Sequence, residues 1–190
     1  EKNNRLHIKM IINKSHTLAP TQIIYLQLGI SQNYRQECIE EIYRLGDSQN
    51  QSTNVKGIMT TYTIWEESKV FNLLLEQILN LSTHIDKSDP KYRSDPRYKY
   101  ELNSAWGATY KKNHYSLTHH HKPNYLSFVY YLKSSGTTPL VFDECDFYIH
   151  PIDDMLIIFP SYLYHSVPIH EEDKDRICIA GNIDLILNKK

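Results

Sequence analysis

The sequence has 190 residues, and its 21 Lys and Arg residues nearly balance its 22 Asp and Glu residues, which gives a net charge of -1. This length is sufficient to bury a genuine core, and we expect a single domain over residues 1–190. The charge argues against a surface that attracts nucleic acid as a whole, although a local basic patch stays open. No apolar run approaches the ~20 residues of a membrane-spanning helix, so no membrane partner is expected.

The cysteine content gives an expectation about the compartment. Cys38, Cys145 and Cys178 are widely separated and odd in number. They form neither a C-x-x-C pair nor the spacing of a disulfide framework. We therefore expect a reducing compartment, the cytoplasm.

Two amphipathic helices are predicted in the first half of the chain. Apolar residues recur at helical spacing in residues 34–45, and Gly46 is a suitable helix stop. Residues 70–81 repeat the pattern. The polar stretch 47–54 and the proline-interrupted stretch 84–100 are expected to be loops or irregular connections.

From residue 105 onward the chain changes to short β-rich segments that are separated by turns. The predicted strands are 106–110, 126–132, 139–142, 155–159 and 176–183. Short strands at this spacing are typical of an antiparallel sandwich or barrel. The expected fold class is mainly β with N-terminal helices (α+β).

A run of three histidines and one distant histidine suggest a metal site. His119 and His121 are two positions apart, so on an extended strand they point to the same face, while His120 points away. Together with His165 they can surround one divalent metal with neutral nitrogens, which suit iron, zinc, copper or nickel. From the residues alone, a surface cluster of histidines stays an equal alternative. The remaining histidines, among them His170, have no spacing that indicates a site.

Arg176 adds a feature that a structural metal site does not need. It follows His165 at a separation that suits the return to a neighbouring strand. Its planar guanidinium matches a carboxylate, so metal and arginine together suggest an acid-bearing cosubstrate. The alternative is a surface ion pair with Glu171, Glu172 or Asp173.

Three segments follow one another in the second half of the chain: residues 115–132, YSLTHHHKPNYLSFVYYL; residues 158–168, IFPSYLYHSVP; and residues 175–182, DRICIAGN. They resemble the ordered motifs of a group of Fe(II)/2-oxoglutarate-dependent oxygenases that is common in phage and marine bacterial genomes and is related to the prolyl hydroxylases. The first segment resembles its H-x-H-P and S-G-V-Y-Y elements, the second F-P-S-x-x-x-H-x-V-x-P, and the third D-R-I-S-I-A-F-N. With a weaker element before the second helix, the resemblance extends over residues 50–183.

The resemblance implies a double-stranded β-helix of the jelly-roll or cupin-like type, with Fe(II) and the cosubstrate 2-oxoglutarate at one open end. Residues 1–100 then supply helical support and a connecting loop, and residues 101–190 form the β-helix core that carries the metal site. It also implies a hydroxylase that uses O2 and 2-oxoglutarate on a C–H bond and releases succinate and CO2. The substrate stays open between a small molecule and a protein side chain.

By the same resemblance, the metal ligands are His119, His121 and His165, and the 2-oxoglutarate-binding residues are Arg176, Tyr131 and Ser127. No catalytic residue is expected beyond the metal ligands. His121 stands where the wider family carries a carboxylate, so three arrangements stay open: ligation by His121, ligation by His119 and His165 alone, or recruitment of Asp143. We favour ligation by His121.

Two other functions remain compatible with these residues. One is a cupin-type three-histidine dioxygenase that does not use 2-oxoglutarate, and the other is a catalytically silent metal- or ligand-binding module of the same fold. Segments 86–100 and 111–118 are expected to flank the mouth of the site and to set its selectivity. Trp106 and Tyr110 either line that mouth or pack beneath it.

Overall fold

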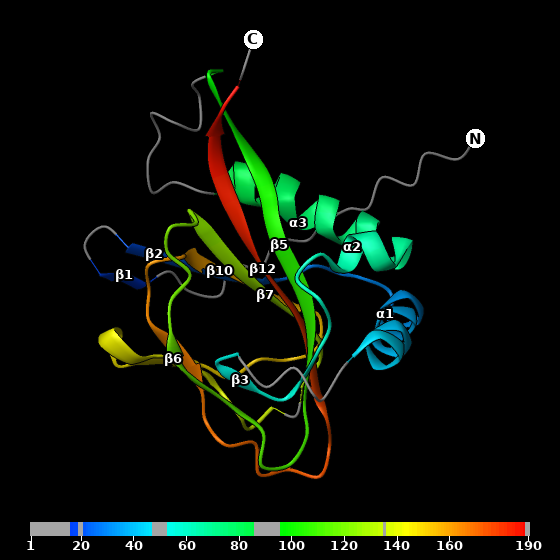
Figure 1. Cartoon of the computed structure of the whole chain (residues 1–190). Helices are drawn as coiled ribbons and strands as arrows, with labels where there is room; N and C mark the ends of the chain where they lie inside the picture. The colour runs from blue at the N-terminus through cyan, green and yellow to red at the C-terminus, as the bar shows by residue number, and fades with distance from the viewer. Residues whose placement is uncertain (1–15, 19–20, 47–52, 86–95, 135, 189–190) are drawn as a thin grey trace.

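The computed structural model describes residues 16–18, 21–46, 53–85, 96–134 and 136–188. Two sheets of antiparallel strands face each other, and the helices lie on the outer face of the larger sheet (Figure 1). In the described part of the chain, no helix has the length and apolar character needed to cross a membrane. Most of the predicted loop 47–54 and of the predicted irregular connection 84–100, namely residues 47–52 and 86–95, lies outside the described residues.

The larger sheet has the strand order β1-β2-β10-β7-β12-β5-β4. Its strands are β1 (His16–Leu18), β2 (Thr21–Gln27), β10 (Met155–Pro160), β7 (Leu126–Lys133), β12 (Arg176–Leu187), β5 (Tyr98–Tyr110) and β4 (Ile58–Met59). The smaller sheet has the order β3-β6-β11-β8-β9. Its strands are β3 (Val55–Lys56), β6 (Tyr115–His119), β11 (His165–Val167), β8 (Leu140–Phe142) and β9 (Phe147–Ile149). This is a double-stranded β-helix, so the expected fold class is confirmed.

The helices form one layer against the larger sheet. They are α1 (Gln32–Leu45), α2 (Ile64–Glu67) and α3 (Asn72–Ile85), with the short 3-10 helix η1 (Lys69–Phe71). A second 3-10 helix, η2 (Asp143–Cys145), connects β8 and β9 of the smaller sheet. The predicted helix 34–45 is confirmed as α1: the Ser31 side chain accepts a hydrogen bond from the first turn, and the Gly46 amide donates to Ile42 where the helix ends. The predicted helix 70–81 corresponds to η1 and α3.

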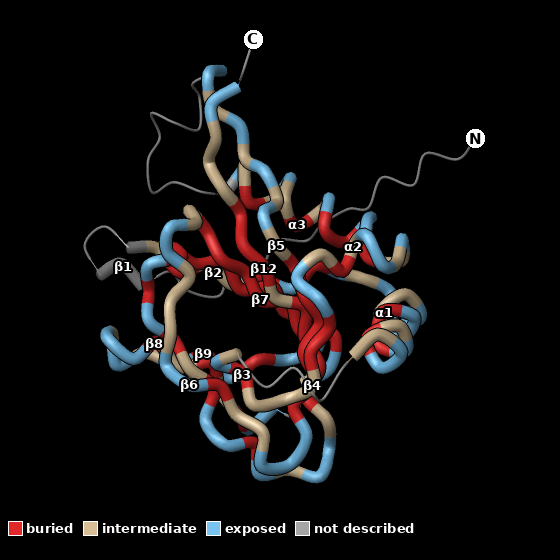
Figure 2. The backbone as a smooth tube through the Cα atoms, viewed as in Figure 1, coloured by how far each residue is buried: buried red, intermediate tan, exposed pale blue. Residues whose placement is uncertain are grey.

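The larger sheet is buried on both faces, which explains why β7 reads as a continuous apolar run. Because side chains alternate along a strand, Phe128 and Tyr130 pack in the core beneath the helices. Val129 and Tyr131 point the other way, into the core between the two sheets. Figure 2 shows this burial along β7 and β12. The space between the sheets is where the candidate site lies.

Several elements differ from those predicted. β5 begins at Tyr98, so the end of the predicted irregular stretch 84–100 is strand. The segment 111–118 is a turn followed by most of β6 rather than one loop. Strands β2, β3 and β4 add the first half of the chain to both sheets, although only helical support was expected there. Short or edge strands lack the long alternation on which sequence prediction depends.

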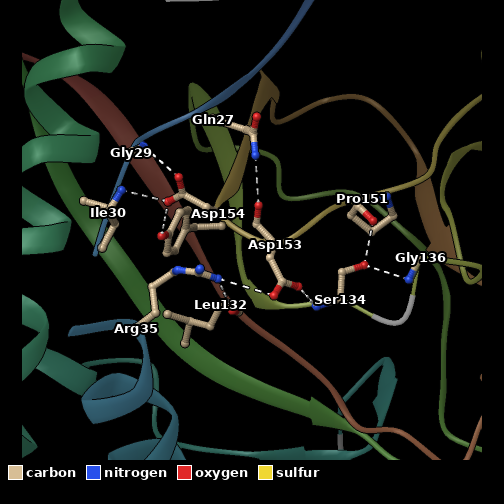
Figure 3. A network of polar contacts seen from close by, with 11 residues as sticks. Gln27, Gly29, Ile30, Arg35, Leu132, Ser134, Gly136, Pro151, Asp153 and Asp154 are labelled. Atoms are coloured by element: carbon tan, nitrogen blue, oxygen red, sulfur yellow. Dashed lines mark hydrogen bonds and ion pairs between the residues drawn. The ribbon is translucent and has the colours of Figure 1, made fainter. Parts of the chain in front are cut away.

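A buried carboxylate ties the helix layer to the larger sheet (Figure 3). Asp154, which is 8% exposed, accepts hydrogen bonds from the amides of Gly29 (2.6 Å) and Ile30 (3.1 Å) and from the hydroxyl of Tyr130 (2.7 Å). Gly29 has a φ of 73°, a region that favours glycine. The connection from β2 to α1 is therefore held against β7 and β10 by one fully hydrogen-bonded acid.

The close approach of β12 to β5 and β7 requires a residue without a side chain at position 181. A Cβ on Gly181 would lie 2.5 Å from both the Phe128 ring and the backbone oxygen of Ser104. We expect Gly181→Ala to lower the free energy of unfolding by about 2 to 3 kcal/mol, because overpacking forces neighbouring groups to move. A chemical denaturation midpoint measures this loss. A loss below about 0.5 kcal/mol, the usual range of surface changes, contradicts the proposed contact.

Candidate functional site

Three imidazoles converge between the sheets. His119 ends β6, His165 begins β11, and the two residues are paired across these antiparallel strands. His121 lies just beyond β6. The ring centroids of His119 and His165 are 4.4 Å apart, and the His121 ring lies 4.9 Å from the first and 5.1 Å from the second. One nitrogen from each ring lies within 4.8 Å of the others, so the three residues can hold one ion together. Their function as ligands stays a prediction.

Backbone carbonyls orient two of the rings. The Nδ1 atom of His119 lies 2.7 Å from the carbonyl oxygen of Leu117, and the Nδ1 atom of His165 lies 3.0 Å from that of Leu163. A carbonyl oxygen can only accept, so each Nδ1 carries the proton and donates. The lone pair is then on Nε2, and this partner arrangement is typical of metal-binding histidines.

The electrostatics of the cluster keep the imidazoles neutral. Burial, followed by repulsion from the neighbouring histidines, lowers the pKa of His121 to about 3 and that of His165 to about 4. Burial also lowers the pKa of His119. A neutral imidazole has a free lone pair for a metal, so at neutral pH the three residues are in the protonation state that metal binding requires.

The geometry bears on the three arrangements that the sequence left open. The His121 ring lies within the cluster, whereas Asp143 is exposed at the start of η2 and is not a member of the described group. The Asp143 carboxylate instead accepts hydrogen bonds from Thr118 (3.3 Å) and Ser166 (3.1 Å). These two residues alternate with the site histidines along β6 and β11. The arrangement favours His121 over Asp143 as the third ligand.

Arg176 is held among aromatic side chains at the start of β12. It is 1% exposed, and its Nη2 donates to the hydroxyl of Tyr131 over 2.8 Å. The guanidinium carbon lies 5.0 Å from the ring centroid of Tyr110 and 5.1 Å from that of Tyr131. Burial raises the pKa of Tyr131 to about 12. The Tyr131 hydroxyl therefore keeps its proton and has it available for an acceptor in the site.

Two donors of Arg176 have no protein partner. Its Nε and Nη1 atoms are buried and make no hydrogen bond in the described part of the chain. The alternative of a surface ion pair is wrong, because the Arg176 side chain is buried. Two of the three acids that the sequence offered have other partners: Asp173 pairs with Lys112 at 2.9 Å, and Glu172 accepts a hydrogen bond from Thr137. Arg176 and the three histidines line one cavity. Unpaired buried guanidinium donors there match a carboxylate-bearing ligand.

Comparisons with known proteins identify the fold. No protein-family model and no curated protein matches the sequence. Among solved structures, the viral collagen prolyl hydroxylase of Paramecium Bursaria Chlorella virus-1, in complex with 2-oxoglutarate, has a TM-score of 0.62 and 14% identity over 85% of this chain and 94% of that chain. A Pseudomonas putida prolyl-4-hydroxylase has a TM-score of 0.63 and 13% identity over 88% and 95%. HygX from Streptomyces hygroscopicus, with nickel and 2-oxoglutarate bound, has a TM-score of 0.63 and 11% identity over 86% and 83%. The chain has the fold of these enzymes.

Within this fold, Ser127 lies apart from the other residues predicted to bind 2-oxoglutarate. It pairs with Asn182 across β7 and β12, whereas Tyr131 pairs with Cys178 near Arg176. Although Ser127 lines the cavity, its hydroxyl is hydrogen-bonded to Ser161 and Asn182. The observation favours a structural function for Ser127 over the predicted contact with the cosubstrate.

Sequence reasoning missed some of the residues that shape this fold's interior. The sequence left open whether Tyr110 lines the mouth of the site or packs beneath it. In the structure its ring lies against the Arg176 guanidinium. The alternation of β5, on which Tyr110 follows Trp106 and Ala108 on one face, was the available signal. His170 had no site spacing and is buried, with its ring between Thr138 and the Lys174 carbonyl.

A second, more open cleft adjoins the histidines and has an empty volume of about 1060 Å³, part of it open to solvent. Uncharged hydrogen-bonding side chains and aromatic rings form most of its lining. They include Asn54, Tyr62, Thr63, Asn124 and Trp106. The Trp106 ring lies 5.7 Å from the His121 ring and 5.2 Å from the Tyr62 ring. The cleft and the cavity that contains Arg176 share four lining residues, namely Val55, Trp106, His119 and His121.

Proposed function

We propose that this protein is an Fe(II)- and 2-oxoglutarate-dependent dioxygenase that hydroxylates a C–H bond of a substrate still to be identified, with succinate and CO2 as coproducts. One observation carries the proposal. Arg176 is a buried cation with two guanidinium nitrogens that have no partner among the described residues, and it lines the same cavity as three neutral histidines. A metal site alone gives no reason to bury such a cation, whereas a diacid that also reaches the metal does.

The donor set fits iron. His119, His121 and His165 would hold the ion through neutral nitrogens, which suit Fe(II) among other transition metals, and three protein ligands leave coordination positions open. Bound iron supplies the reactivity toward O2 and the cosubstrate. The absence of a carboxylate from the cluster leaves the bound ion with its full charge, which favours an anionic cosubstrate beside it.

The chain's own residues bind and orient the cosubstrate. Arg176 is proposed to donate hydrogen bonds from its unpaired guanidinium nitrogens to the far carboxylate of 2-oxoglutarate. Tyr131, protonated and already bonded to Arg176, would donate its hydroxyl hydrogen to the same carboxylate. Apolar side chains complete the cavity, among them Val129, Leu140 and Phe159. They exclude water and strengthen the ionic contact.

A three-histidine dioxygenase that does not use 2-oxoglutarate is the second candidate. The ligand cluster without a carboxylate favours it. The buried Arg176 disfavours this candidate, because a dioxygenase that does not use 2-oxoglutarate needs no site for a diacid. Turnover separates a silent binding module of the same fold from the proposed enzyme, since only an active 2-oxoglutarate oxygenase releases succinate above the metal-free background. The cytoplasmic location agrees with three free cysteines and stays a prediction.

An anaerobic titration tests the proposed function. Fe(II) is added to the protein, followed by 2-oxoglutarate, and the visible absorption spectrum is recorded. We expect the charge-transfer band of a metal-chelated keto acid. Succinate, which lacks the keto group, is the matched control and should give no band. A protein that binds Fe(II) yet gives no band with 2-oxoglutarate contradicts the cosubstrate assignment.

A further inference from the structure

We propose that Ser161, Ser127 and Asn182 form a positioning clamp that holds His121 in the metal cluster. The inference rests on the proposed function, in which His121 is the third metal ligand. The clamp consists of the side chains of these three residues, which are hydrogen-bonded to one another, and Ser104 is hydrogen-bonded to its end. None of them belongs to the histidine cluster; they act through the backbone that carries His121.

His121 needs such support more than the other two histidines do. His119 and His165 are paired across neighbouring strands, and each ring is oriented by a carbonyl oxygen. His121 lies beyond the end of β6, and its ring makes no hydrogen bond among the described residues, although it packs against Trp106. Its position therefore depends on the anchorage of its backbone.

Ser161 anchors both ends of the segment that carries His121. The His121 amide donates to the Ser161 carbonyl oxygen over 2.8 Å, and the Ser161 amide donates to the Tyr125 carbonyl oxygen over 3.1 Å. Within the segment, the Asn124 amide donates to the His121 carbonyl oxygen over 3.0 Å. Since Ser161 follows β10 and leads directly toward His165, it links two of the three histidines.

The side chains of the clamp fix Ser161 in turn. Ser127 donates to the Asn182 side-chain oxygen over 2.8 Å, so the 2.7 Å contact between the two serine hydroxyls has Ser161 as its donor. The Asn182 side-chain nitrogen donates to Ser104 over 3.0 Å. Ser161, Ser127 and Asn182 are 0%, 1% and 6% exposed. A buried polar chain in which each group is satisfied is rigid and specifies one arrangement.

A backbone irregularity supports the same assignment. The pairing of β12 with β5 shifts between Asn182 and Ile183, where Asn182 lies opposite Ser104 and Ile183 lies opposite Leu102. A β-bulge of this kind bends a strand and re-aims a side chain, and bulges are frequent beside functional sites. Here the bulge coincides with the residue that joins β5, β7 and the Ser161 turn.

A double-mutant cycle with Co(II), used as a probe for the metal site, tests the clamp. Ser127→Ala removes the hydrogen-bond partner of the Ser161 hydroxyl and of the Asn182 side-chain oxygen. We expect it to weaken Co(II) affinity by about 10-fold or more, the size of effect found when a group that orients a metal ligand is removed. In a His121→Ala background the same substitution should change the affinity by less than about 2-fold, because the ligand through which it acts is gone. Optical titration measures each affinity.

Two further variants separate positioning from stability. Ser161→Ala removes the other hydroxyl and should repeat the result, which keeps the test decisive if Ser127→Ala fails to fold. Ser82→Ala is the matched control: Ser82 is a fully buried serine of α3 whose hydroxyl donates to a backbone carbonyl in the helix layer. It should lower thermal stability and leave Co(II) affinity unchanged.

The outcomes distinguish the clamp from the proposed function. Equal losses in both backgrounds, with His121→Ala itself weakening Co(II) binding, overturn the clamp and leave the three-histidine site standing. No effect of His121→Ala overturns the clamp and leaves a site of two histidines. Failure of the unmodified protein to bind Co(II) overturns the proposed function and the clamp together.

Discussion

Replacing Arg176 with methionine is expected to abolish 2-oxoglutarate binding and, at the same time, to stabilise the ligand-free protein. The guanidinium is buried without a described carboxylate partner, and two of its donors are unpaired. A buried charge in this state is costly, and well-packed apolar replacements of buried ionic groups are often more stable by about 1 to 4 kcal/mol. Loss of the paired contact to a carboxylate should weaken 2-oxoglutarate binding by about 100-fold or more, equivalent to roughly 3 kcal/mol.

Thermal unfolding with and without 2-oxoglutarate, in the presence of Co(II), measures both effects. At about 100 times its dissociation constant the ligand should stabilise the unmodified protein by about 2.7 kcal/mol and the variant not at all. Arg35→Met is the matched control, because Arg35 is also largely buried but donates to the Leu132 carbonyl and pairs with Asp153 at 3.5 Å. It should destabilise the protein and leave the ligand effect intact. An Arg176→Met variant that still responds to 2-oxoglutarate contradicts the proposed site.

Acid is expected to destabilise the metal-free protein as the pH falls below about 6.5, the ordinary pKa of histidine. The folded-state pKa values of His121 and His165 are lowered to about 3 and about 4 by burial and mutual repulsion. Between these values and 6.5, the unfolded chain binds protons that the folded protein does not, so the free energy of unfolding falls with the pH. For His165 alone the loss is on the order of 3 kcal/mol when the pH reaches its folded pKa.

Denaturant unfolding from pH 7 to pH 4.5 measures this dependence, and a variant isolates the histidine contribution from that of the carboxylates. His165→Gln removes one imidazole whose pKa is lowered. It should reduce the slope of the free energy of unfolding against pH in that window by up to the contribution of one proton. An identical decline in the variant and the unmodified protein means that the cluster histidines are not buried in the neutral form. A rise in stability toward acid contradicts the sign itself.

The sequence was sufficient where a pattern is local and long. Residues 126–132 and 176–183 were predicted as strands from their β-branched and aromatic residues, and α1 from its helical spacing and Gly46. The short strands β3 and β4 were not predicted, because two residues carry no measurable periodicity. They exist because β5 and β6 offer them backbone partners.

The same division applies to the candidate site. The spacing of His119 and His121 and the distant His165 and Arg176 were visible in the sequence, because ligand chemistry depends on residue type. Ser127 was assigned to the cosubstrate from its motif position alone. Its partners Ser161 and Asn182 come from other strands, and only the sheet register shows that their hydrogen bonds occupy its hydroxyl.

The amino-acid sequence by itself determined the residue types of this protein's chemistry and the main strands and helices that carry them, since both follow from side-chain properties and local periodicity. Only the tertiary structure decided which side chains share a space. It brought the imidazoles of β6 and β11 together, buried Arg176 with no acid partner among the described residues, and placed Asp143 outside the cluster. Such proximity depends on strand pairing between residues distant in the chain, and no local pattern encodes it.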